Sequence, residues 1–215
     1  MNTVERLAQS LQKSGLGPHP NTDLNHIGVG LIRELAKGEP LDAPALEAVN
    51  EALGGDEATV SRILMGLTER DEEGRIVGVA GLTLAPTKHR YIVGDKTLYT
   101  WCTLDGLYMA SILGQTGRIE TRCPATDISI EVTVHPDGTG TVNPSGVVMS
   151  MTVPEQIFGP RPVSDTRASF CNFVHFLASQ EALEQWKPDN IEVEAISMDD
   201  GFALGLLIGQ GFCNP

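Results

Sequence analysis

The chain changes its sequence pattern near residue 86, and this change limits the folds that it can adopt. Before that point, apolar residues recur at helical spacing between capping residues and glycine stops, which predicts helices. The expected helices cover residues 3–14, a stretch from Asp23 or Asn25 to Lys37, and residues 43–53. A further helix should open at Asp56, with an apolar stripe of Val60, Ile63, Leu64 and Leu67.

Short strands bounded by glycine and proline turns dominate the rest of the chain. Two strands precede the change, at residues 75–79 and 82–84, and the later candidates are 91–93, 97–101, 118–123, 128–134, 147–153 and 193–196. Pro136-Asp137-Gly138 is a turn signal between two strand-like runs. Further helices are predicted at 104–113, 181–186 and 199–208. The pattern therefore predicts an α+β fold whose strands are mostly antiparallel.

Helices followed by a hairpin over residues 20–85 form a winged-helix-like pattern, and that fold most often binds DNA. The charge of this segment opposes such a function, because it holds five Lys and Arg against twelve Asp and Glu. We therefore expect residues 1–85 to form an N-terminal helical, winged-helix-like segment that serves as a lid or packing domain. Residues 86–215 should form the catalytic α+β domain.

The whole chain of 215 residues is acidic, with a formal net charge of −13. Such a surface repels nucleic acid and anionic lipid. The sequence has no apolar run of about eighteen residues and no secretory signal, so neither a membrane nor nucleic acid is an expected partner. Four cysteines without a secretory signal favour free thiols in a reducing cytoplasm over a disulfide framework.

Two of these cysteines lie among aromatic and aliphatic residues. Cys102 occurs in LYTWCTLD, and Cys171 occurs 69 residues later in SFCNFVHF. A pair of soft thiolates with one nearby carboxylate is a poor zinc site, but it suits a thiophilic metal whose attached carbon needs a proton. Asp105, three residues after Cys102, is the candidate carboxylate. Trp101 and Phe170 are candidates for the wall of an apolar pocket.

The residues alone leave a structural alternative for each of these three polar side chains. Cys102 is predicted at a strand end just before a helix, where backbone N–H groups should lower the pKa of its thiol. Asp105 would lie in the first turn of that helix, where a carboxylate also simply stabilises the helix. Cys171 has no neighbouring acid, and a cysteine in such surroundings is more often a small buried apolar residue than a nucleophile.

The sequence resembles the organomercurial (alkylmercury) lyase family over about residues 24–200. The likeness is carried by WCTLD, by the CPAT segment that begins at Cys123 and by FCNFVHF, together with LIRELAKGEP and GLTL upstream. The resemblance implies that Cys102 and Cys171 are catalytic and that Asp105 handles the proton. It also implies that Cys123 is structural.

The same resemblance implies a reaction and its partners. The enzyme would cleave the carbon–mercury bond of organomercurials by protonolysis, which yields a hydrocarbon and Hg²⁺. The Hg²⁺ product would be held by Cys102, Cys171 and an oxygen of Asp105, and no organic cofactor is expected. Low-molecular-weight thiols and mercuric reductase are the expected acceptors of Hg²⁺.

Two other functions could use the same thiols. One is an acidic winged-helix regulator that senses metal or thiol stress, and the other is a thiol redox enzyme. In the lyase reaction, either Cys102 or Cys171 can be the thiol that first attacks mercury. Cys213 matches no family position and is interpreted as incidental, while His175 is interpreted as a core histidine rather than a partner of Cys171.

Overall fold

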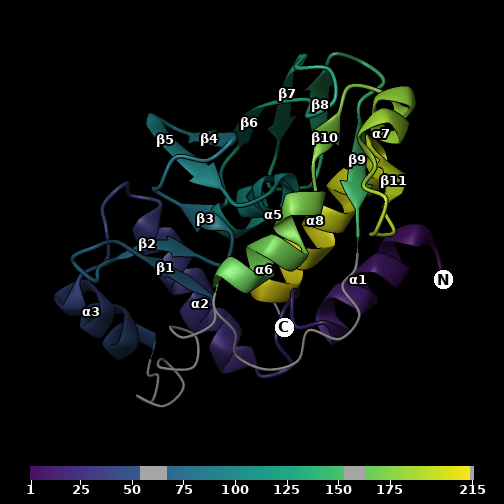
Figure 1. Ribbon diagram of the computed structural model, residues 1–215. Helices are drawn as coiled ribbons and strands as arrows, with labels where there is room; N and C mark the ends of the chain where they lie inside the picture. Colours follow the sequence, from purple (N-terminus) through teal and green to yellow (C-terminus); the bar gives the residue numbers. More distant parts are fainter. Residues whose placement is uncertain (54–66, 153–162, 214–215) are drawn as a thin grey trace.

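The computed structural model describes residues 1–53, 67–152 and 163–213 (Figure 1). The N-terminal part is helical, with α1 at Thr3–Lys13, α2 at Thr22–Leu35 and α3 at Ala43–Leu53. The side chain of Asn21 caps α2 by accepting the Asp23 N–H, so the prediction of a cap at Asp23 or Asn25 was wrong. The helix predicted from Asp56 lies outside the described residues.

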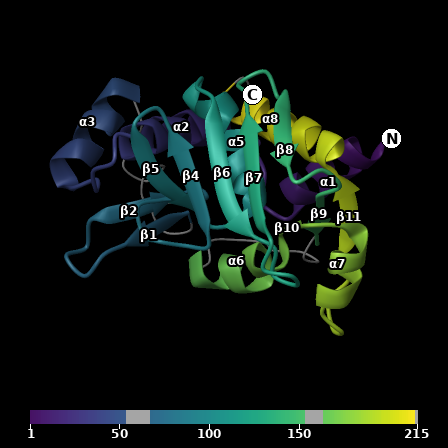
Figure 2. The ribbon, with the colours of Figure 1, turned by 90° about the horizontal axis from the view of Figure 1, so that it is seen from above.

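An eight-stranded antiparallel sheet forms the centre of the molecule (Figure 2). Its spatial order is β1-β2-β3-β5-β4-β6-β7-β8, and every neighbouring pair runs antiparallel. The strands are Thr68–Arg70 (β1), Ile76–Val79 (β2), Leu82–Thr83 (β3), His89–Val93 (β4), Lys96–Thr100 (β5), Gly117–Arg122 (β6), Ser129–Val134 (β7) and Gly140–Asn143 (β8).

A second, smaller sheet lies beyond β8 in the chain. Strand β9 (Val148–Met151) pairs antiparallel with both β10 (Phe176–Leu177) and β11 (Glu194–Ser197). The segment between β9 and β10 contains helix α6 and the short 3-10 helix η1, and α7 follows β10. Their bounds are Val163–Ser169 (α6), Cys171–Phe173 (η1) and Gln180–Trp186 (α7).

Helix α5 (Thr103–Leu113) is the central helix of the fold and is almost entirely buried. It packs against the large sheet and against α8 (Met198–Cys213), which lies beside it in both views (Figures 1 and 2). Two glycines of α8 permit this close approach. A Cβ at Gly205 would lie 2.7 Å from the Leu107 side chain, and one at Gly209 would lie 2.7 Å from Ser111. This packing fixes the position of α5 and of the residues at its N-terminus.

The predicted α+β fold with mostly antiparallel strands is confirmed. The predicted turn at 136–138 joins β7 to β8, where Gly138 has a φ of 79° and Asp137 accepts the Thr139 N–H. The sequence did not predict β1, β8, β10, α6 or η1, and it ended the last helix at residue 208 rather than Cys213. The two-residue β10 shows why: such a strand is defined by its pairing with β9 and has no sequence period of its own.

The large sheet continues across the predicted domain boundary at residue 85. Strand β3 pairs with β5, so the hairpin of the N-terminal segment and the strands that follow share one sheet. The division into 1–85 and 86–215 stays a prediction, as does the winged-helix-like arrangement, because one of its helices is not described. Among the described residues, no helix has the length and apolar character needed to cross a membrane.

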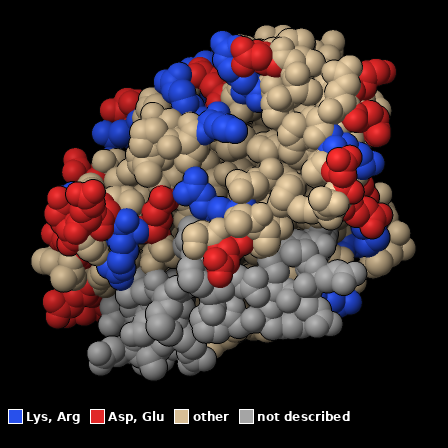
Figure 3. Space-filling view, in the orientation of Figure 1, with Lys and Arg blue, Asp and Glu red and all other residues tan. Residues whose placement is uncertain are grey.

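Acidic side chains gather over α3 and the β1–β2 hairpin on the face seen in Figure 3. Glu72 and Glu73 are exposed in the turn of this hairpin, next to Asp71, whose carboxylate binds Arg75. These side chains belong to the segment 20–85, in which Asp and Glu outnumber Lys and Arg. Such a surface would meet phosphate groups with charge of the same sign.

Candidate active site

Cys102 lies at the junction between β5 and α5. It is the N-cap residue of α5, with extended φ and ψ of −143° and 177°, and its side chain is fully buried. The Thr100 hydroxyl donates to the Cys102 carbonyl over 2.8 Å, which ties the junction to the end of the strand. The helix predicted at 104–113 begins one residue earlier than expected, at Thr103. The prediction that Cys102 lies between a strand end and a helix start is confirmed.

Asp105 lies in the first turn of α5 and points back toward Cys102. Its Oδ2 accepts the backbone N–H of Cys102 over 2.7 Å, and its Oδ1 lies 2.9 Å from the Tyr108 hydroxyl. Only 7 % of the residue is exposed. Burial raises the pKa of Asp105 to about 6, although the hydrogen bonds from Cys102 and Tyr108 oppose the shift. The group is therefore mainly a carboxylate at neutral pH, and it binds a proton more readily than an exposed aspartate does.

Cys171 enters the same region from η1, far away in the sequence. It is buried, with 4 % exposed. The Thr103 hydroxyl donates to the Val174 carbonyl over 3.2 Å, which joins the start of α5 to the end of η1. Ser150 of β9 holds the other side of the segment by donating to the Phe173 carbonyl over 2.9 Å. Contacts from two distant elements therefore fix the position of the second thiol.

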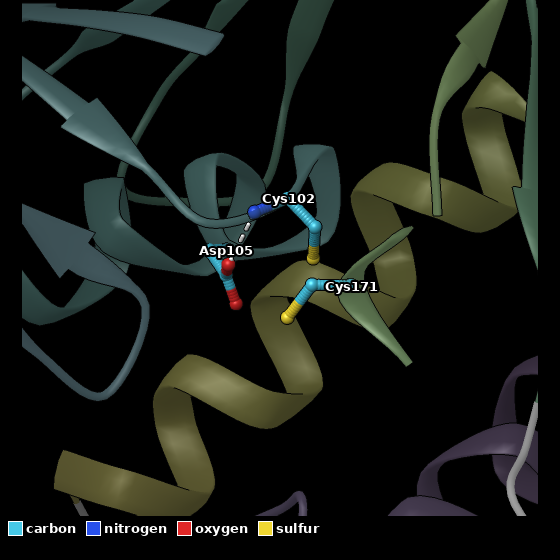
Figure 4. A group of neighbouring side chains, drawn as sticks. All are labelled: Cys102, Asp105 and Cys171. Atoms are coloured by element: carbon cyan, nitrogen blue, oxygen red, sulfur yellow. Dashed lines mark hydrogen bonds between the residues drawn. The ribbon is translucent and has the colours of Figure 1, made fainter. Parts of the chain in front are cut away.

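The two thiols and the carboxylate meet in one buried group (Figure 4). One ligand atom of each residue, a sulfur of Cys102 or Cys171 or an oxygen of Asp105, lies within 4.8 Å of the other two. Within the described parts of the chain, this is the one group of three or more His, Cys, Asp or Glu residues that could hold a metal ion. Two sulfurs and one oxygen match a soft, thiophilic metal.

The pKa of the Cys102 thiol differs from the sequence prediction. Burial, followed by the hydrogen bond with Cys171 and the charge of Asp105, raises this pKa well above its usual value. The expectation of a lowered pKa was therefore wrong. The hydrogen bond from the Asp105 N–H at the helix start does lower the pKa of Cys102, as predicted, but burial and the neighbouring Cys171 and Asp105 raise it by more. The thiol thus carries its proton at neutral pH, and the adjacent carboxylate can accept that proton.

The aromatic neighbours of the two cysteines are both buried, with Trp101 7 % and Phe170 4 % exposed. The Trp101 indole N–H donates to Glu69 Oε2 over 3.1 Å. Glu69 also accepts from the Thr83 hydroxyl over 3.0 Å, and its Oε1 lies 3.4 Å from Arg167 of α6. The predicted role of Trp101 and Phe170 as pocket walls stays a prediction. Glu69 and Arg167 were not predicted, because their contact joins β1 to a residue 98 positions later in the chain and no local sequence pattern signals it.

The other two cysteines do not belong to the group formed by Cys102, Asp105 and Cys171. Cys123 is buried just after β6, where its N–H donates to Ile128 and its carbonyl accepts from Asp127. This position is compatible with the structural role predicted for it. Cys213 is partly exposed at the end of α8.

His175 also lies outside the group, as the sequence interpretation expected. Its Nε2 lies 2.9 Å from the Asn172 carbonyl oxygen, and its ring packs against His89 and Trp186.

Tyr108 contacts Asp105 through its hydroxyl, and the sequence analysis did not predict it as a residue of the site. Its spacing was an available signal, because residues three apart on a helix lie on one face.

A family model described as alkylmercury lyase matches residues 82–209, which run from β3 into α8 and include all three residues of the group. An alkylmercury lyase of Pseudomonas putida is 35 % identical over 208 residues, which cover 96 % of this chain and 92 % of that protein. The chain belongs to the alkylmercury lyase family. A second alkylmercury lyase, from Staphylococcus epidermidis, is 36 % identical over 184 residues, covering 85 % of this chain and 81 % of the relative.

A solved structure has the same fold. It is described as the mercury-bound form of MerB2, and it superposes with a TM-score of 0.69 at 21 % sequence identity. The match covers 89 % of this chain and 100 % of the other. At that identity the likeness concerns the fold. The recognition of the alkylmercury lyase family from the motifs around Cys102, Cys123 and Cys171 is confirmed.

Proposed function

We propose that this member of the alkylmercury lyase family cleaves the carbon–mercury bond of organomercurials at Cys102, Asp105 and Cys171. The observation that carries the proposal is the buried group of two sulfurs and one carboxylate, whose ligand atoms lie within 4.8 Å of one another. Two thiols can bind mercury and donate electron density to it, and the carboxylate can move a proton. Protonolysis needs both of these capacities in one place.

The first step transfers the organomercurial cation to one thiol of the pair. A low-molecular-weight thiolate that carried the substrate leaves and takes the proton of that protein thiol. The new sulfur–mercury bond holds the organic group next to the second thiol and Asp105. Either Cys102 or Cys171 can be the first to attack.

The second step breaks the carbon–mercury bond. The remaining thiol gives its proton to Asp105, and its sulfur donates an electron pair to mercury. Asp105 then delivers the proton to the carbon, which keeps the electron pair of the broken bond and leaves as the hydrocarbon. The raised pKa of Asp105, about 6, suits a group that must accept and then release a proton near neutral pH.

The Hg²⁺ product remains bound by the two thiolates, with an oxygen of Asp105 as a third ligand. We assign its removal to low-molecular-weight thiols and to mercuric reductase, because soft thiol ligands can displace those of the site. Four free cysteines suit a reducing compartment, and we therefore place the activity in the cytoplasm. Trp101 and Phe170 are proposed to line the space for the organic group.

Release of benzene from phenylmercury tests the proposal. The purified protein, with excess thiol and no added nucleotide or metal, should release benzene well above the rate of thiol alone. The Cys213→Ser variant is the matched control, because it removes a thiol that lies outside the site and should keep the wild-type rate. Benzene release at the thiol-only rate by the wild-type protein would overturn the proposed activity.

A further inference from the structure

The hydroxyl of Tyr108 lies between two acceptors. Its oxygen is 2.7 Å from the Ala80 carbonyl oxygen and 2.9 Å from Asp105 Oδ1, and the tyrosine is 7 % exposed. A phenol has a single proton to donate, whereas a backbone carbonyl can only accept. Both contacts can be full two-centre hydrogen bonds at once only if the Asp105 carboxyl carries a proton and donates it to the tyrosine oxygen.

Two arrangements of protons therefore fit the same heavy atoms. With an ionised Asp105, the Tyr108 hydroxyl donates to Oδ1. With a protonated Asp105, the acid donates to the Tyr108 oxygen, and the tyrosine proton turns to the Ala80 carbonyl. Rotation of the hydroxyl about its C–O bond exchanges the two arrangements, and the heavy atoms need only a small adjustment, because the 2.7 Å contact with the Ala80 carbonyl lengthens when its proton turns away.

We propose that Tyr108 is a positioning residue that holds the Asp105 carboxyl in one place both before and after it takes up the thiol proton. This inference rests on the proposed function, in which Asp105 carries a proton from a thiol to carbon. A carrier that shifted when its charge changed would lose its alignment with the thiol or with the carbon. A displacement of about 1 Å can lower a rate by about 100-fold.

The acceptor opposite Asp105 is held by the β2–β3 turn. The Ala80 N–H donates to the Leu67 carbonyl over 2.8 Å, and the Gly81 carbonyl accepts the Trp101 N–H over 2.9 Å. Ala80 has a φ of 43° and Gly81 a φ of 99°, so both adopt the left-handed region. The turn thereby presents the Ala80 carbonyl to the tyrosine from a fixed direction.

The other carboxyl oxygen of Asp105 has a separate partner. Oδ2 accepts the Cys102 N–H, a backbone donor whose position follows from the start of α5. Oδ1 is therefore the oxygen that can take up a proton and donate it in a hydrogen bond to the Tyr108 oxygen. The residue acts through Asp105, and the proposal requires no contact between Tyr108 and the substrate.

The test compares Tyr108→Phe with Tyr91→Phe. Each change removes one buried hydroxyl, but among the described residues the Tyr91 hydroxyl has no hydrogen-bond partner. We expect Tyr108→Phe to take up phenylmercury as the wild type does and to release benzene about 10- to 100-fold more slowly in a single turnover. Tyr91→Phe should keep the wild-type rate. The folded fraction of each variant is measured under the same conditions by denaturant unfolding, so that partial unfolding is not taken for the expected loss.

Several outcomes would overturn the positioning role. A wild-type rate in Tyr108→Phe would do so, as would a loss of phenylmercury uptake that accounts for the whole rate change. An equal loss caused by Tyr108→Phe in an Asp105→Asn background would also do so, because residues that act through one another are not additive. Failure of the proposed function is distinct, since the wild-type protein would then release no benzene above the thiol background.

Discussion

The backbone N–H of Cys102 donates a hydrogen bond to Asp105 Oδ2 over 2.7 Å. The thiol and the carboxylate are therefore positioned by the same helix start, and a change in one alters the surroundings of the other. The pKa values reflect this coupling, because the charge of Asp105 contributes to the raised pKa of the Cys102 thiol.

Removal of either thiol of the site should abolish turnover. We expect Cys102→Ser and Cys171→Ser each to reduce benzene release to the thiol background, because one thiolate cannot both hold mercury and complete its activation. The measurement is benzene release from phenylmercury at saturating substrate. A Cys171→Ser variant that kept most of the wild-type rate would contradict the two-thiolate site.

Replacement of Asp105 should separate mercury binding from proton transfer. We expect Asp105→Asn to take up phenylmercury through Cys102 and Cys171 but to release benzene about 10²- to 10⁴-fold more slowly, which is the usual contribution of general acid–base catalysis. Uptake is measured as phenylmercury retained by the protein, and release as benzene. Near-normal turnover would mean that Asp105 only stabilises the first turn of α5.

The same variant should change how the free energy of unfolding depends on pH. The pKa of Asp105 rises from 3.8 to about 6 on folding, so ionisation of this group destabilises the folded state. The cost is absent below about pH 3.8, grows as the pH rises and is complete above about pH 6. A shift of this size corresponds to about 3 kcal/mol, and a neutral asparagine does not have it.

We therefore expect the free energy of unfolding of Asp105→Asn, relative to that of the wild type, to be higher at pH 8 than at pH 4.5. Denaturant unfolding at the two pH values measures the difference. Glu72→Gln is the control, since that carboxylate is exposed in the β1–β2 turn and should show no comparable pH dependence. An unchanged difference between Asp105→Asn and the wild type at both pH values would show that the pKa of Asp105 is not raised.

A side chain at Gly81 should damage the site. A Cβ at this position would lie 2.6 Å from both the Asp105 Cγ and the Tyr108 hydroxyl oxygen, and the φ of 99° is itself unfavourable for alanine. We expect Gly81→Ala to lose most of its benzene release and to melt at a lower temperature. Gly74→Ala is the matched control, because Gly74 has a φ of 80° but nothing within 4 Å of an added Cβ. Equal effects of the two changes on turnover would contradict a specific clash at Asp105.

The sequence by itself determined the fold class and the identity of the chemical groups. The strand-like runs, the turn at Pro136-Asp137-Gly138 and the buried helix after Cys102 were readable because their periods and turn residues are local. Cys102 and Asp105 could be paired from the sequence for the same reason. Three residues at a helix start span less than one turn, so their proximity follows from the helix alone.

Only the tertiary structure decided what surrounds these groups. Cys171 comes to the site through contacts of η1 with Thr103 and Ser150, which join segments that are distant in the sequence. The pKa of Cys102 was predicted in the wrong direction, because local helix geometry lowers it whereas burial against Cys171 and Asp105 raises it more. The contact of Tyr108 with the Ala80 carbonyl depends in the same way on the packing of β2–β3 against α5. Desolvation and contacts between distant segments are properties of the packed chain, and a sequence pattern does not encode them locally.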